Sequence, residues 1–175
     1  MSRSSLFVGT YTDGASQGIY RCELDSQSGE LTTPSMVAET ENPSFLAMHP
    51  STEYLYAVNE TPEGAVTAFA ISDDGDIEVH ARRRIGSGHP CYASIARNGA
   101  YLFVAHYTGG AVSMIPIDAN GSLGHPTIVE HSGSSVDPER QRQPHPHAAV
   151  QDPRNDSLYV PDLGTDRIIR YDIDR

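Results

Sequence analysis

Hydrophobic residues occur in short runs that recur in the same order along the chain, and each run ends in polar turn residues. Short apolar runs bounded by turn residues predict β-strands, and helical periodicity is nearly absent. The first run of each unit begins with proline and covers residues 43–50, 90–97 and 146–153. The second and third runs follow at residues 54–59 and 64–71, 101–106 and 110–117, and 157–162 and 166–173.

A turn and a fourth strand complete the repeating unit. The turns contain Asp-Gly or Asn-Gly, dipeptides that favour tight β-hairpins, and the fourth strands are predicted at 77–81 and 127–130. Pro43 and Pro90 are 47 residues apart. That spacing and four strands per unit are typical of a β-propeller blade. A stack of sandwich hairpins is the alternative, but it does not predict a four-strand period with fixed turn chemistry.

We therefore predict one all-β domain, residues 1–175, folded as a β-propeller of four-stranded antiparallel blades. Its blade-like units are expected near residues 5–40, 43–86, 90–144 and 145–175. The first strand pair, 6–11 and 18–24, matches the second and third strands of a unit, so about three and a half blades are expected. We expect the chain to be the N-terminal half of a longer one. Such a half is expected to be inactive and to associate through open strand edges.

The charge of the chain limits its partners. All 12 basic residues are arginine, and the 23 acidic residues give a formal net charge of −11, which repels nucleic acid. Acidity without lysine is expected of a protein from a high-salt cytosol, where ions screen self-repulsion, with compositional drift in a GC-rich genome as the alternative. No apolar run approaches the roughly 18 residues of a membrane span, and the opening residues lack a secretory pattern, so we predict a cytoplasmic protein.

Two cysteines and no CxxC spacing argue against a zinc knuckle or a disulfide scaffold. Cys22 and Cys91 are isolated in the sequence. We interpret both as buried small apolar residues.

One face of the predicted disc gathers polar residues. In a blade, the start of the innermost strand and the end of the second strand meet on the face that holds the central mouth. Glu60 and Asp162 lie at the ends of second strands, and His145 and His147 precede the last innermost strand. The connection through residues 132–147 is about nine residues longer than the repeat requires and is rich in charged residues. Long loops tend to carry function, and a solvated polar loop is the alternative.

The same loop carries a family resemblance. Residues 136–147 (Val-Asp-Pro-Glu-Arg-Gln-Arg-Gln-Pro-His-Pro-His) and 159–168 (Tyr-Val-Pro-Asp-Leu-Gly-Thr-Asp-Arg-Ile) resemble the seven-bladed lactonase family. That family contains 6-phosphogluconolactonases and the related carboxy-muconate cyclase. Further matches lie at residues 7–12, 56–60, 88–92, 106–112 and 152–153, so the likeness covers nearly the whole chain. One departure is His106-Tyr107, where the family more often has Asn-Tyr. Seven blades are twice the three and a half expected here.

The resemblance implies cofactor-free ring opening of a sugar lactone, 6-phosphogluconolactone or a related aldonolactone. Hydrolysis needs a base to activate water, donors for the developing oxyanion and cations for an anionic substituent. Histidine can exchange protons near neutral pH, and arginine offers permanently charged planar donors. We predict His145 or His147 as the acid/base, Arg140 and Arg142 as anion and oxyanion partners, and Glu60 and Asp162 as groups that orient the histidine or the water. The predicted partners are a small anionic or sugar lactone and the C-terminal half of the propeller.

Three alternatives stay open at this point. His145 and His147, with Asp162 or Glu60, could hold a divalent ion that polarises a lactone carbonyl, although cationic arginines beside a metal are unfavourable. A muconate-type cyclase would use the same histidines and arginines to manage a proton and an anion. A non-catalytic propeller could bind proteins through its faces, since the fold alone does not fix function.

Overall fold

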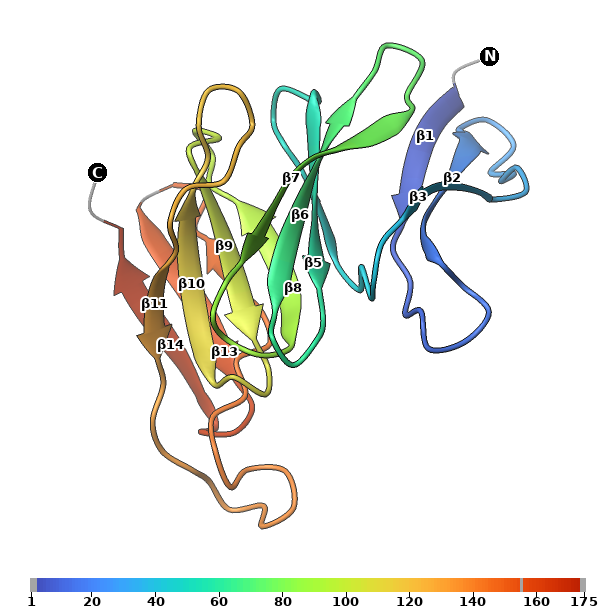
Figure 1. Cartoon of the computed structure of the whole chain (residues 1–175). Helices are drawn as coiled ribbons and strands as arrows, with labels where there is room; N and C mark the ends of the chain where they lie inside the picture. The colour runs from blue at the N-terminus through green and yellow to red at the C-terminus, as the bar shows by residue number, and fades with distance from the viewer. Residues whose placement is uncertain (1–2, 155, 174–175) are drawn as a thin grey trace.

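Four antiparallel β-sheets stand side by side along an arc in the computed structural model (Figure 1). The structure describes residues 3–154 and 156–173, so the outermost residues of the predicted domain lie outside the described part. The described residues contain strands and turns without helices, and accordingly no helix among them could cross a membrane. The all-β architecture predicted from the repeats is confirmed.

Each sheet follows the chain order from its inner to its outer edge. The first sheet holds β1 (Arg3–Val8), β2 (Gly18–Asp25) and β3 (Ser35–Glu39). The second holds β4 (Leu46–Met48), β5 (Tyr54–Asn59), β6 (Ala65–Ile71) and β7 (Ile77–Arg84). The third holds β8 (Pro90–Ile95), β9 (Tyr101–His106), β10 (Ala111–Pro116) and β11 (Thr127–Glu130). The fourth holds β12 (Val150–Gln151), β13 (Ser157–Asp162) and β14 (Arg167–Asp172).

The second strands have the predicted bounds, while the strands that precede them are shorter than predicted. β4 and β12 keep only three and two residues of the predicted runs. The first strand also differs, because β1 ends at Val8 rather than Tyr11. A side chain at Gly9 would collide with the carbonyl oxygen of Pro43, so the chain there leaves the ladder and packs against the connection into the second sheet.

The core lies between neighbouring sheets, which explains the continuous apolar runs of the second strands. On β5, Tyr56 and Val58 pack toward Val104 of the third sheet. The alternate residue Leu55 packs toward Ile19 of the first sheet. Since successive side chains of a strand point to opposite faces, a strand between two other sheets is apolar on both.

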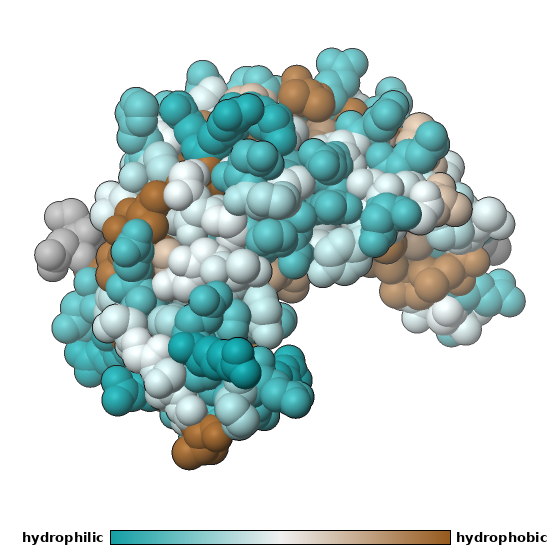
Figure 2. Space-filling view, turned by 60° about the horizontal axis from the view of Figure 1, so that its bottom comes forward, coloured by the Kyte–Doolittle hydropathy of each residue, from teal (hydrophilic) through white to brown (hydrophobic). Residues whose placement is uncertain are grey.

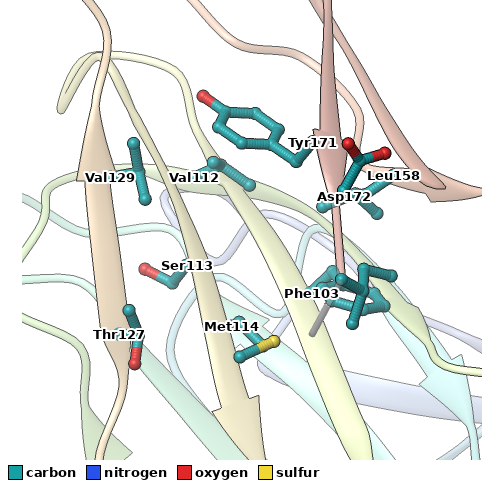
Figure 3. Close-up of a pocket in the computed structure, with 10 residues that line it drawn as sticks. Phe103, Val112, Ser113, Met114, Thr127, Val129, Leu158, Tyr171 and Asp172 are labelled. Atoms are coloured by element: carbon teal, nitrogen blue, oxygen red, sulfur yellow. The ribbon is translucent and has the colours of Figure 1, made fainter. Parts of the chain in front are cut away.

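A cavity of about 220 Å³ lies between the third and fourth sheets (Figure 3). Phe103 and Val112 line it from the third sheet, and Leu158 and Tyr171 line it from the fourth. The lining is mainly apolar and includes none of the six predicted site residues. It is a packing space between blades, and the candidate site must be sought elsewhere.

The arc has an open concave side and an uncovered end (Figure 2). On β1, Phe7 packs toward the second sheet. Its neighbours Leu6 and Val8 therefore face the other way, and they are 37% and 43% exposed. Figure 2 shows apolar surface at this end of the arc, beside the first sheet.

Candidate active site at the mouth of the propeller

Three buried polar residues occupy one position of the repeat, the last residue of the second strand. They are Asn59 on β5, His106 on β9 and Asp162 on β13. Their exposed fractions are 0%, 0% and 2%. Buried polar groups need hydrogen-bond partners, and each of these side chains binds the connection that arrives from the preceding sheet.

Asn59 and His106 bind these connections through backbone carbonyls. The Asn59 amide donates to the carbonyl of Glu41 at 2.6 Å. The His106 ring has Nδ1 at 3.2 Å from the Ser87 carbonyl and Nε2 at 2.7 Å from the Ser113 hydroxyl. Burial lowers the pKa of His106 to about 4, an effect that the Ser87 carbonyl partly offsets. His106 is therefore a neutral structural residue whose Nδ1–H donates and whose Nε2 accepts.

Asp162 holds the third connection with a carboxylate. One oxygen accepts the backbone amides of His145 at 2.8 Å, Gly164 at 2.9 Å and Thr165 at 3.2 Å. The other oxygen lies 2.6 Å from Nδ1 of His131. Burial favours the neutral acid, but the hydrogen bonds from the His145 amide and the His131 ring outweigh it, so the pKa of Asp162 is lowered. Asp162 anchors the loop and binds the His145 backbone, while the ring that it orients is that of His131.

His145 is half-buried and its ring is fixed on two sides. Its Nδ1 lies 2.8 Å from the carbonyl oxygen of Tyr107, and its ring stacks on the Tyr107 ring at 4.4 Å with an interplanar angle of 18°. A carbonyl oxygen can only accept, so the neutral ring carries its hydrogen on Nδ1. Nε2 then holds the lone pair, and it has no hydrogen-bond partner within the described residues. In this tautomer Nε2 can accept a proton, as a general base must.

His147 also contacts Tyr107 and is exposed. The two rings meet edge to face, with centroids 5.4 Å apart and an interplanar angle of 79°. The His147 amide donates to the Pro161 carbonyl at 3.0 Å, which fixes the backbone, while its ring makes no hydrogen bond within residues 3–154 and 156–173. Both predicted histidines thus gather around Tyr107, and only His145 has its tautomer set by a hydrogen bond.

The two predicted arginines differ in what they bind. In a turn of the loop, the Asp137 carboxylate accepts the amides of Glu139 at 2.8 Å and Arg140 at 3.1 Å. The Arg142 guanidinium donates back to the Pro138 carbonyl of the same loop. The Arg140 side chain is exposed and forms no hydrogen bond or ion pair in the described part of the chain. Arg140 is therefore the arginine with all its donors available to an anion.

Glu60 follows β5 and joins the first two sheets at the mouth. Its Oε2 accepts the hydroxyls of Tyr11 at 3.0 Å and Ser44 at 2.5 Å. Burial, followed by the hydrogen bond to Glu60, raises the pKa of Tyr11, so this phenol stays a donor. Glu60 is thus held in place beside the mouth, in contact with the first and second sheets.

Cys91 lies at the mouth and is only half-buried, which differs from the predicted buried residue, whereas Cys22 is buried as predicted. The thiol is 3.7 Å from both the Ala105 and Pro146 carbonyls. Burial, and then the negative charge of Glu60, raises the pKa of Cys91 to about 11.

The lactone turnover that the family resemblance implies is therefore expected to stay within about twofold of wild type when Cys91 is replaced with alanine. With a pKa of about 11, only about one thiol in 10⁴ is ionised at pH 7, and the thiolate is the nucleophilic form. Initial rates of the two proteins at equal concentration check this. A loss of tenfold or more in the Cys91→Ala variant would show that the thiol takes part in the reaction.

The side chains proposed for a metal do not gather into a metal-binding group. Among the described residues, no three His, Cys, Asp or Glu side chains lie close enough together to hold an ion. The Asp162 carboxylate is taken up by amides and His131, and the Glu60 carboxylate by two hydroxyls. The two carboxylates that the metal alternative needs are therefore used in other bonds.

The sequence analysis assigned no role to three residues that shape this site. Tyr107, which it noted only in the family match, contacts both histidines, His131 binds Asp162, and the Gln141 side chain binds the Leu163 carbonyl at 2.8 Å. His131 stands directly before the long insertion, at the mouth end of the connection that follows β11. That position is the one signal in the sequence that could have identified it.

Comparison with known proteins identifies the family of the chain. The family model described as "Lactonase, 7-bladed beta-propeller" matches residues 5–175. The chain belongs to the seven-bladed β-propeller lactonase family. It is 32% identical over 168 residues to a 6-phosphogluconolactonase of Bacillus subtilis, covering 94% of this chain and 48% of that protein.

Solved structures of the family have the same half-propeller. The periplasmic gluconolactonase PpgL of Pseudomonas aeruginosa superposes with a TM-score of 0.91 at 34% identity, covering 98% of this chain and 50% of that one. A candidate 6-phosphogluconolactonase from Bacteroides fragilis gives a TM-score of 0.92 at 34% identity, covering 99% and 49%. The chain spans about half the length of the relatives it matches. The count of about three and a half blades out of seven is thereby confirmed.

Proposed function

We propose that the protein hydrolyses a sugar lactone at the propeller mouth, with His145 as the acid/base, and that 6-phosphogluconolactone or a related aldonolactone is the substrate. Relatives named 6-phosphogluconolactonase and gluconolactonase support the reaction class. The observation that carries the assignment to His145 is its hydrogen bond to the Tyr107 carbonyl. In the neutral ring this bond leaves the lone pair on Nε2, which has no hydrogen-bond partner among the described residues. His145 stands in the same loop as Arg140, whose guanidinium makes no hydrogen bond within those residues either.

The reaction follows from these groups. Nε2 of His145 removes a proton from a water molecule as its oxygen attacks the lactone carbonyl carbon. The carbonyl oxygen becomes an oxyanion, which needs a hydrogen-bond donor or a cation close by, and Arg140 or Arg142 can supply it. When the ring carbon–oxygen bond breaks, the protonated His145 returns its proton to the leaving oxygen. The product is the open-chain hydroxy acid, and His145 is neutral again.

Glu60 and Asp162 have supporting roles in this proposal. Glu60 lies at the edge of the mouth and can orient the attacking water. Asp162 acts through the backbone amide of His145, to which it is bonded at 2.8 Å.

Arg140 is proposed to bind the anionic substituent of the substrate. Replacing it with alanine is expected to raise KM for 6-phosphogluconolactone by about tenfold and to leave KM for gluconolactone nearly unchanged, because a charge-assisted hydrogen bond to phosphate is lost. Arg154→Ala is the matched control, since Arg154 is an exposed arginine of another loop. Equal changes with both lactones would contradict phosphate binding by Arg140.

The proposal is tested by comparing substrates with the intact gene product in high salt. Initial hydrolysis rates of 6-phosphogluconolactone and gluconolactone are measured with and without a chelator, and spontaneous hydrolysis is subtracted. Turnover that the chelator does not change is the expected result. Turnover of a carboxylated muconate in place of both lactones would identify a cyclase, and turnover of none would contradict both enzyme functions and favour a binding propeller. The cytoplasmic location and the high-salt cytosol stay predictions from the sequence.

A further inference from the structure

Both ends of the loop that carries the proposed catalytic groups are fastened to one buried carboxylate. We call residues 131–147 the mouth loop. At its start, the His131 ring binds one oxygen of Asp162 at 2.6 Å, and at its end the His145 amide binds the other oxygen at 2.8 Å. The side chains of His131 and Asp162 are 2% and 0% exposed. Water therefore does not compete for these hydrogen bonds.

The hydrogen-bond chain continues to the last described strand. Nε2 of His131 lies 2.7 Å from the hydroxyl of Tyr171 on β14. The two rings are nearly parallel, with centroids 6.1 Å apart and an interplanar angle of 25°. Asp162 can only accept, so Nδ1 of His131 carries a hydrogen, and in the neutral ring Nε2 then accepts the Tyr171 hydroxyl. Figure 3 shows Tyr171 on the fourth sheet at the edge of the inter-sheet cavity, across from Val112 and Val129 of the third.

In the second and third sheets, the last residue of the second strand binds the arriving connection without such a hydrogen-bond chain. Asn59 and His106 each donate directly to a backbone carbonyl of the arriving connection. A carboxylate at this position cannot donate, so the third connection must supply the donors itself. The His131 ring and the His145 amide supply them from the two ends of the mouth loop. The two bonds to Asp162 thus come from opposite ends of the long loop, whereas Asn59 binds the neighbouring residues Thr40 and Glu41 of its connection.

We propose that Asp162, His131 and Tyr171 form a buried positioning relay that holds the mouth loop so that the His145 ring stays against the Tyr107 carbonyl. None of the three touches substrate in this arrangement. They act through the backbone of His145, which fixes where Nε2 points. The kinetic part of this inference rests on the proposed lactone hydrolysis, whereas the ordering of the loop does not.

The test uses variants that remove the relay step by step in the intact gene product. His131→Ala removes both ring bonds, and Tyr171→Phe removes only the hydroxyl. His131→Asn is the conservative variant, since its amide can still donate to Asp162. Tyr101→Phe is the matched control, because Tyr101 packs against the same apolar cluster as Tyr171 and its hydroxyl has no hydrogen bond within the described residues.

The first readout is hydrogen exchange at the mouth loop, with exchange in β9 as the internal measure of global folding. His131→Ala is expected to speed exchange of the His145 amide by tenfold or more, Tyr171→Phe by about fivefold, and Tyr101→Phe not at all. Unchanged exchange in both His131→Ala and Tyr171→Phe would overturn the relay. Faster exchange in β9 would show that His131→Ala destabilises the whole fold. In that case the relay is judged from Tyr171→Phe, whose exchange in the mouth loop is compared with that of Tyr101→Phe.

The second readout separates positioning of His145 from substrate binding. Because the base is misplaced in Tyr171→Phe, kcat is expected to fall by about tenfold while KM stays within about twofold of wild type. His131→Asn is expected to recover part of the kcat that His131→Ala loses. A change in KM alone would overturn positioning of the base. If the wild-type protein turns over no lactone, the proposed function fails, and hydrogen exchange still decides whether the relay orders the loop.

Discussion

Replacing His145 with glutamine is expected to lower kcat for lactone hydrolysis by about 10²- to 10⁴-fold, the usual contribution of a positioned acid/base. Glutamine fills similar space but has no group that gains and loses a proton near neutral pH. The same change at His147 is expected to lower kcat less than tenfold, because no hydrogen bond within the described residues fixes the tautomer of that ring. Initial rates at saturating lactone, corrected for spontaneous hydrolysis, provide the measurement.

A control variant separates the loss of a catalytic group from a general loss of folding or stability in this experiment. His125→Gln is suited, since His125 is an exposed histidine in the connection between β10 and β11, at the opposite end of these strands from the mouth. It is expected to keep wild-type activity. Full activity in His145→Gln would rule out the proposed base, and a larger loss in His147→Gln would move that role to His147.

The second large effect concerns stability and pH. Burial of His106 lowers its pKa to about 4, against about 6.5 in an unfolded chain. Between these values the unfolded chain binds a proton that the folded protein excludes. The stabilisation is therefore complete above about pH 6.5 and is lost as the pH falls toward 4. From pH 7.5 to pH 5 this single residue is expected to remove about 2 kcal/mol from the free energy of unfolding.

His106→Asn isolates that contribution. Asparagine occupies the equivalent position in the second sheet, where Asn59 donates to a connection carbonyl and accepts the Thr67 hydroxyl at 2.7 Å. The variant keeps both hydrogen bonds in this arrangement but does not titrate. The free energy of unfolding is measured with denaturant at pH 7.5 and pH 5. The decrease in this free energy between the two pH values is expected to be about 2 kcal/mol smaller in the variant than in the wild type. Parallel changes in both proteins would contradict a neutral buried His106.

The repeats predicted the fold because blade strands obey local rules. The second strands, such as 54–59 and 101–106, are apolar on both faces because each stands between two sheets, so their bounds agree with the structure. The innermost strands were predicted too long. β4 and β12 lose residues at both ends and β8 only its last two, and hydropathy along the chain does not report where ladder pairing stops.

The candidate site was predictable only in part for the same reason. The insertion identified the loop that carries His145, His147 and Arg140, since its length departs from the repeat. The difference between the two histidines depends on a carbonyl of Tyr107, which is 38 residues from His145. The binding of His131 to Asp162 spans 31 residues. Such pairs are created by the stacking of blades, and no local pattern in the sequence encodes them.

The most direct measurement is the initial rate of 6-phosphogluconolactone hydrolysis by the intact gene product, with the His145→Gln variant at equal concentration as the blank. Acid release above the spontaneous rate in the wild type, and none in the blank, is the expected result. It would assign lactone hydrolysis to this mouth and to this ring. Equal rates in the two proteins, or a wild-type rate no higher than the spontaneous one, would contradict it.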